Sequence, residues 1–96
     1  MKAYLQIDLK VIDPGFMEYA TRIPALIEKH GGRYLVQGVT PVAVQSSSAA
    51  PEHSVILEFP SEADARAFLA ERESSDLHQI WHKTTEARIL LLVGCT

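Results

Sequence analysis

The chain has little cysteine, no long hydrophobic run and no strong excess of charge, and each shortage excludes a class of protein. Its one cysteine, Cys95, cannot form an intramolecular disulfide, which excludes a disulfide scaffold and favours a reducing cytoplasm. No apolar stretch approaches the length of a transmembrane helix, and residues 1–6 become polar too early for a signal peptide. We therefore expect a cytoplasmic protein with no membrane partner.

Charge and motifs restrict the function further. Nine basic residues against twelve acidic ones give a net charge of −3, without the basic stripe that nucleic acids require. The sequence contains no glycine-rich phosphate loop, no Cys-x-x-Cys pair and no Ser-His-Asp pattern. Cys95 has no basic motif beside it, so we expect no nucleophilic role. We expect neither a nucleic-acid partner nor a cofactor.

What the chain does contain is a hydrophobic content of 47% in 96 residues, which is enough for one core, so we expect a single domain over residues 1–96. Alternating apolar and polar residues predict strands over 3–12 and 53–59. A β-prone run predicts a strand over 33–36. The apolar run within 87–93 predicts a last strand that is buried on both sides.

Helix signals fill the intervals between these strands. Asp13 is the expected N-cap of a first helix, with Pro14 at its first position. That helix should stop at Gly31-Gly32, because glycine tolerates the left-handed conformation that closes a helix. Ser61 is the expected cap of a second helix. The polar stretch 71–76 should break it, and a short third helix should follow near 77–84.

The predicted order is strand, helix, strand, strand, helix, strand, which is the ferredoxin-like α+β arrangement of a four-stranded antiparallel sheet with its helices on one face. Apolar residues also alternate onto the face that the helices leave uncovered. They are Tyr4, Ile56, Leu90 and Leu92. A monomer seldom exposes such a surface, so we predict a homodimer whose sheets pack face to face as a dimeric α/β barrel.

Four segments of the sequence resemble a known family. They are the Asp13-Pro14 helix start, the junction His-Gly-Gly-Arg-Tyr-Leu-Val over 30–36, the corner Glu-Phe-Pro-Ser over 58–61, and the apolar strand that ends at Gly94. Over nearly its whole length the chain resembles the bacterial "domain of unknown function 1330" family, which has no established reaction. The resemblance implies a dimeric α+β barrel, a superfamily that includes cofactor-free monooxygenases, lactone isomerases, dye-decolourising peroxidases and haem-degrading enzymes.

One segment departs from the family pattern. In the family, the second helical region usually opens Ser-Pro-Glu-Tyr and carries an arginine further on. This chain instead has Ser-Ser-Asp-Leu over 74–77, followed by Trp-His-Lys over 81–83. A ligand contact that relatives make with this region is therefore not carried over to this chain.

Three polar residues are candidates for catalysis in a cleft between the helices and the sheet. His30 ends the first helix, where it either caps the last carbonyls or acts chemically. Arg33 offers a fork of donors to a carboxylate or enolate oxygen, or it pairs with Glu58 or Asp8. Asp8, in the middle of the first strand, is either solvated or partly buried and able to act as a general base.

Four further residues are candidates for ligand binding. Tyr19 and Trp81 could form an aromatic wall for a planar ligand, although aromatic residues at helical spacing are more typical of a core. Tyr34 points to the opposite face of its strand from Arg33, so one of the two faces the helices. His82 lies four residues after His78 on the third helix, a spacing that lets two imidazoles share a metal ion. Because no third ligand is evident, we predict no metal site.

The residues leave two functions open. One is a cofactor-free enzyme that binds a small organic acid or aromatic molecule and performs proton-transfer or oxygen chemistry with Arg33, His30 and Asp8. The other is a non-catalytic homodimeric module that binds a metabolite or a partner protein, in which the same residues are structural. A polar cluster beside an open cavity favours the enzyme, whereas a space filled by apolar side chains favours the module.

Overall fold

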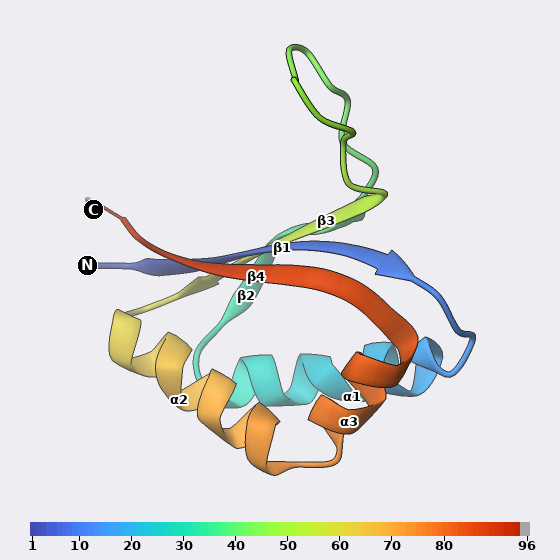
Figure 1. Ribbon diagram of the computed structural model, residues 1–96. Coiled ribbons are helices and arrows are strands. Elements are labelled where there is room, and N and C mark those ends of the chain that lie inside the picture. The colour runs from blue at the N-terminus through green and yellow to red at the C-terminus, as the bar shows by residue number, and fades with distance from the viewer. Residues whose placement is uncertain (95–96) are drawn as a thin grey trace.

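The computed structural model describes residues 1–94, so Cys95 lies outside the described residues. Its strands are β1 (Ala3–Val11), β2 (Arg33–Val39), β3 (His53–Phe59) and β4 (Thr85–Val93), and its helices are α1 (Phe16–Lys29), α2 (Glu62–Ser74) and α3 (Leu77–Thr84). The strands form one sheet in the order β2-β3-β1-β4, with every neighbouring pair antiparallel. All the helices lie on one face of it (Figure 1). The predicted ferredoxin-like α+β fold is confirmed.

The core lies between the sheet and the helices. Along β1, every second residue from Ala3 to Leu9 is buried beneath the helices, and the residues between them are half-buried on the opposite face. Leu5, Leu57 and Phe59 are each no more than 1% exposed and form the centre of this core. The alternation read from the sequence is therefore the alternation between a helix-covered inner face and an open outer face.

The glycine pair ends α1 as predicted. Gly31 has a φ of +77°, the left-handed conformation that closes a helix. The Gly31 and Gly32 backbone N–H groups donate to the carbonyls of Glu28 and Ile27, each at 2.9 Å. Strand β2 then begins at once, at Arg33.

The start of α1 differs from the prediction. Pro14 is not the first helical residue, because the helix begins at Phe16 with Gly15 before it. Asp13 does not cap the helix as an N-cap residue. Its Oδ2 instead accepts the Gly15 backbone N–H at 2.7 Å, which makes a tight turn ahead of the helix.

The end of α2 and the burial of β4 also differ from the prediction. Helix α2 continues through part of the polar stretch 71–76 and ends at Ser74, since the side chain of Arg72 is buried against the other helices instead of facing solvent. The Ser61 cap of this helix is confirmed, its Oγ accepting the Asp64 backbone N–H at 3.1 Å. Strand β4 is not buried on both sides: Ile89 and Leu91 are half-buried against the core, whereas Leu90 and Leu92 on its outer face are 38% and 47% exposed.

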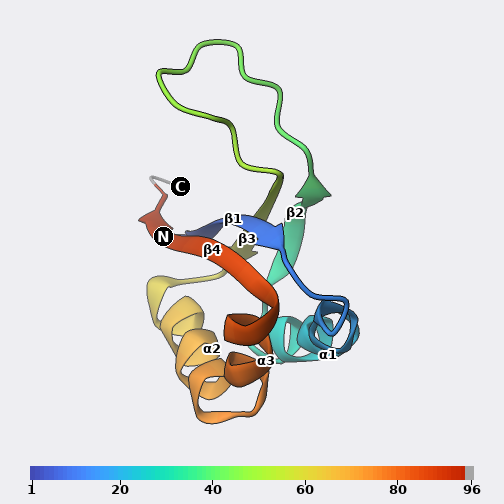
Figure 2. The same ribbon diagram turned by 45° about the vertical axis from the view of Figure 1, so that its right-hand side comes forward.

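The segment over 40–52, between β2 and β3, extends away from the sheet on the side opposite the helices (Figure 2). Its valines are almost fully exposed, Val42 at 86% and Val44 at 95%. The uncovered sheet face and this segment therefore present apolar side chains on the same side of the molecule. Within residues 1–94, no helix is long and apolar enough to span a bilayer.

Candidate functional site

A cavity of about 380 Å³ lies between the sheet and the helices. Its floor consists of inner-face residues of β1 and β3, and its walls come from α1, α2 and α3. Phe16 and Ala20 of α1 border this open space. Two lining side chains, Val11 and Met17, are 36% and 63% exposed, so the cavity reaches the surface beside them. The interlayer space is therefore not filled by the core.

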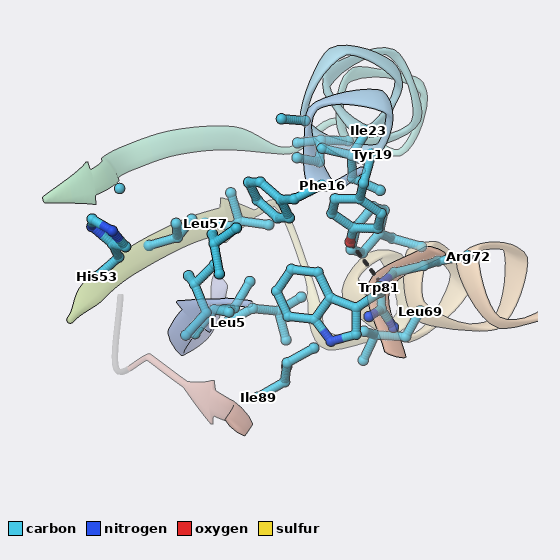
Figure 3. Close-up of a pocket in the computed structure, with 18 of the residues that line it drawn as sticks. Leu5, Phe16, Tyr19, Ile23, His53, Leu57, Leu69, Arg72, Trp81 and Ile89 are labelled. Atoms are coloured by element: carbon cyan, nitrogen blue, oxygen red, sulfur yellow. Dashed lines mark hydrogen bonds between the residues drawn. The ribbon is translucent and has the colours of Figure 1, made fainter. Parts of the chain in front are cut away.

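One wall of the cavity is an aromatic cluster (Figure 3). The rings of Tyr19 and Trp81 lie 4.9 Å apart between centroids, and Phe16 lies 5.9 Å from Tyr19 and 6.2 Å from Trp81. The structure thus brings together Tyr19 and Trp81, two of the predicted ligand-binding residues, and both border the cavity. Their faces offer the flat apolar surface that planar organic molecules bind.

Arg72 lies at one end of the cavity, beside Tyr19 and Trp81. It was not among the site residues predicted from the sequence. Its side chain is 3% exposed, and its Nε donates to the Tyr19 hydroxyl at 2.8 Å. Its guanidinium carbon lies 5.2 Å from the centroid of the Trp81 ring, a cation–π distance. A signal was present, because Arg72 continues the spacing of the buried residues Ala65 and Phe68 along α2.

His53 lies at the other end of the cavity, at the start of β3 (Figure 3). Its Nδ1 is buried and makes no hydrogen bond within residues 1–94. The sequence signal was the alternation of β3, which places His53 on the same face as Val55 and Leu57. The cavity is thus apolar along its length, with a cationic group at one end and an imidazole at the other.

Residues 2–95 match the model of the family described as "Domain of unknown function (DUF1330)". The chain belongs to this family. No protein among the curated sequences matches it. The family match confirms the predicted resemblance and adds no reaction to it.

Solved structures share the fold of this DUF1330 chain at low sequence identity. A protein of unknown function from Rhodopseudomonas palustris has a TM-score of 0.69 at 16% identity, with 99% of this chain and 83% of that chain covered. A variant of SnoaB, a cofactor-independent oxygenase from Streptomyces nogalater, has a TM-score of 0.70 at 11% identity, covering 99% and 94%. A dimeric ferredoxin-like protein of unknown function from Jannaschia sp. CCS1 has a TM-score of 0.59 at 12% identity, with 98% of this chain and 100% of that chain covered.

The three predicted catalytic residues of this DUF1330 chain do not meet beside the cavity. Arg33 is on the outer face, where its Nε donates to Glu58 Oε1 at 3.0 Å, so the ion pair left open by the sequence is present. Asp8 is also on the outer face and accepts from Arg88 at 2.8 Å and from Ser54 at 3.1 Å. Alternation turns both side chains away from the helices, so neither of them borders the cavity.

His30 caps the end of α1, with its Nε2 3.0 Å from Glu71 Oε1. The hydrogen bond from Lys29, followed by that from His30, lowers the pKa of the Glu71 carboxyl. His30 does not border the cavity either. Catalytic roles for His30, Arg33 and Asp8 stay predictions; Arg33 and Asp8 form ion pairs, and His30 lies within hydrogen-bond distance of a carboxylate.

The remaining predicted ligand residues lie apart from the cavity. Tyr34 points to the inner face and packs against the core beside the cavity without bordering it. His82 is exposed on α3, with its ring 4.4 Å from that of His78 between centroids. Among residues 1–94, no three histidine, cysteine, aspartate or glutamate side chains are grouped so that they could hold a metal ion.

Proposed function

We propose that this protein binds a small, largely apolar organic molecule in the cavity between the sheet and the helices. The cavity itself carries the proposal. Its volume of about 380 Å³ lies within the range of natural small-molecule sites. Protein interiors are normally close-packed, and an apolar void loses dispersion contacts on every side, so a fold of this size gains nothing from keeping it open. The aromatic wall of Tyr19 and Trp81 favours a planar or ring-containing ligand.

The experiment uses N-phenyl-1-naphthylamine, a neutral fluorescent molecule whose emission rises in apolar sites. The chain has one tryptophan, Trp81, and it borders the cavity, so energy transfer from Trp81 reports binding there. Ala20→Phe fills the cavity from α1, whereas Ala25→Phe places the same side chain on the exposed side of the same helix. We expect saturable binding that Ala20→Phe abolishes and Ala25→Phe preserves. Equal binding by both variants contradicts the proposal.

We propose further that the functional unit is a homodimer that pairs through the outer face of the sheet. Leu90, Leu92 and Ile56 lie on that face beside Tyr4 and Gln6. Leu92 is 47% exposed in the single chain, and burying such a surface against a second copy removes it from water. The exposed valines of the 40–52 segment lie on the same side and would contact the second copy as well. The Jannaschia protein of this fold is described as dimeric.

Light scattering after gel filtration tests this pairing. Leu92→Glu places a charge in the middle of the proposed interface and should yield a monomer. Met17→Glu is the matched control, because Met17 is an exposed apolar residue on α1, away from the sheet's outer face. A wild-type monomer, or dimers of both variants, contradicts the proposal.

A second candidate function is proton transfer from the bound ligand, and His53 favours it. His53 borders the cavity, and its imidazole can act as a general base for a C–H bond next to a carbonyl. Chemistry without a cofactor is described for SnoaB, which shares this fold. The probe is 2-tetralone in deuterated water, with exchange of its α-hydrogens followed by NMR. His53→Gln should slow the exchange that the protein accelerates, and His82→Gln should not. If the wild-type protein does not accelerate the exchange, the protein binds the ligand without catalysing proton transfer.

A further inference from the structure

Arg72 differs from every other arginine in its electrostatic partners. Each of the other arginines lies within 4.0 Å of a carboxylate at the surface: Arg22 pairs with Asp76, Arg33 with Glu58, Arg66 with Glu62 and Arg88 with Asp8. Within residues 1–94, Arg72 has no such partner, although it is the most deeply buried of them at 3% exposure. Arg72 is thus the arginine that most needs a counter-ion, because it is buried, and within residues 1–94 it has none.

The contacts that Arg72 does make leave part of its hydrogen-bonding capacity unused. Its Nε donates to the Tyr19 hydroxyl, and its guanidinium lies over the Trp81 and Tyr19 rings. Ring faces attract a cation, but they offer its terminal nitrogens only weak N–H···π contacts in place of strong hydrogen bonds. A buried cation is costly unless it is paired and hydrogen-bonded, so the terminal N–H groups of Arg72 need an acceptor. Because Arg72 borders the cavity, that acceptor can come from a ligand.

We propose that Arg72 is the anchor for a carboxylate, so that the ligand is a monocarboxylic acid with an apolar or aromatic body. The inference rests on the proposed function, because it assumes that the cavity binds a ligand. The carboxylate bonds the terminal nitrogens of Arg72, the guanidinium being suited to this planar group. The body of the acid lies along the aromatic wall and points towards His53 at the opposite end (Figure 3).

Tyr19 completes the anchor. Its oxygen accepts the hydrogen bond from Arg72, so its own hydroxyl hydrogen is free to point at the second oxygen of the carboxylate. The Tyr19 hydroxyl is a neutral donor at physiological pH, and burial raises its pKa further. The competing explanation is that Arg72 is purely structural and only holds Tyr19 and Trp81 in place. The two explanations differ in whether removing the charge changes which ligands bind.

The test compares 4-phenylbutanoate with 4-phenylbutanamide, which have the same shape but differ in charge. Both are titrated by calorimetry into the wild-type protein, Arg72→Met, Arg72→Lys and Tyr19→Phe. Arg66→Met is the control on the same helix, since Arg66 is exposed and paired with Glu62. We expect the wild type and Arg66→Met to prefer the acid by about tenfold or more, as a charge-assisted pair requires.

Arg72→Met should bring the affinity of the acid down to that of the amide or below it, while the affinity of the amide stays unchanged. Tyr19→Phe and Arg72→Lys should show smaller losses of the same preference, and they test the anchor if Arg72→Met does not fold. An equal preference in the wild type and all three variants overturns the carboxylate anchor but leaves the binding cavity intact. Failure of both probes and of N-phenyl-1-naphthylamine to bind the wild type overturns the proposed function itself.

Discussion

Arg72 and Tyr19 are 53 positions apart in sequence, yet the Arg72 Nε donates a hydrogen bond of 2.8 Å to the Tyr19 hydroxyl. The bond joins the last turn of α2 to the first half of α1 and places Arg72, the only charged residue that is buried within residues 1–94, at the cavity. Both residues are helix positions that apolar side chains would fill in an ordinary core. Their polarity is therefore the chemical feature that most needs a functional explanation.

Arg72→Met should not greatly reduce stability if the guanidinium serves a ligand. The variant loses the cation–π contacts and the bond to Tyr19, but it also removes a buried charge without a carboxylate partner. We expect the free energy of unfolding to stay within about 1 kcal/mol of the wild type, because these effects offset each other. Urea unfolding followed by circular dichroism measures it. A loss of more than about 3 kcal/mol would mean that Arg72 is mainly structural.

Stability should fall in alkali because of Tyr19. Burial raises the pKa of the Tyr19 hydroxyl above 10.0, and the charge and hydrogen bond of Arg72 oppose part of that rise. Because the folded pKa exceeds the unfolded one, the stabilisation is complete below the unfolded pKa and is lost as pH rises through the folded pKa. Burial also raises the pKa of Tyr34, with the same sign. Urea midpoints on both sides of pH 10 should drop less in Tyr19→Phe than in the wild type. Parallel curves would show that Tyr19 does not titrate differently in the two states.

Arg33 should affect an outer-face carboxylate and not the cavity. Its hydrogen bond is the main cause that lowers the pKa of Glu58, with burial opposing it and Lys2 adding to it. A lowered folded pKa stabilises the fold above the unfolded pKa of Glu58, and this is lost as pH falls through the folded pKa. In Arg33→Ala, the Glu58 carboxyl followed by NMR should titrate at higher pH. Binding of N-phenyl-1-naphthylamine to this variant should stay unchanged. Weaker binding would mean that Arg33 contributes to the ligand site.

Gly32 should tolerate no side chain. A Cβ there would lie 2.6 Å from Phe59 Cε1 and 2.9 Å from Ile27 Cγ2, both in the packed core. We expect Gly32→Ala to lower the free energy of unfolding by about 1–3 kcal/mol through overpacking. Gly38→Ala is the comparison, because Gly38 has a φ of +68° but open space around it. It should cost about 1–2 kcal/mol from backbone strain alone. Thermal or urea unfolding of both variants measures these losses. An unchanged free energy of unfolding in Gly32→Ala would contradict the close packing around Gly32.

The fold could be predicted from the sequence because its signals are local. Alternation defined β1 and β3, and the glycine pair at 31–32 defined where α1 ends. The same alternation already placed Asp8 opposite Leu5 and Leu9, on the face that the helices do not cover. Asp8 therefore lies outside the space beneath the helices, and its catalytic role stays a prediction.

The cavity could not be predicted in the same way. A cavity forms where side chains from separate helices and strands do not contact one another. The spacing of residues within one segment gives no information about such contacts. Tyr19 and Trp81 were found as aromatic residues on helices, but their contact with each other depends on how α1 and α3 pack. Arg72 was read as part of a polar stretch, because a charged residue at the end of a helix normally faces solvent.

The most direct measurement is a crystal structure of the protein grown with 4-phenylbutanoate. We expect the phenyl ring against Tyr19 and Trp81, inside the cavity, with the carboxylate paired to the terminal nitrogens of Arg72. A cavity closed by its own side chains, or the acid bound elsewhere with Arg72 unpaired, would contradict it.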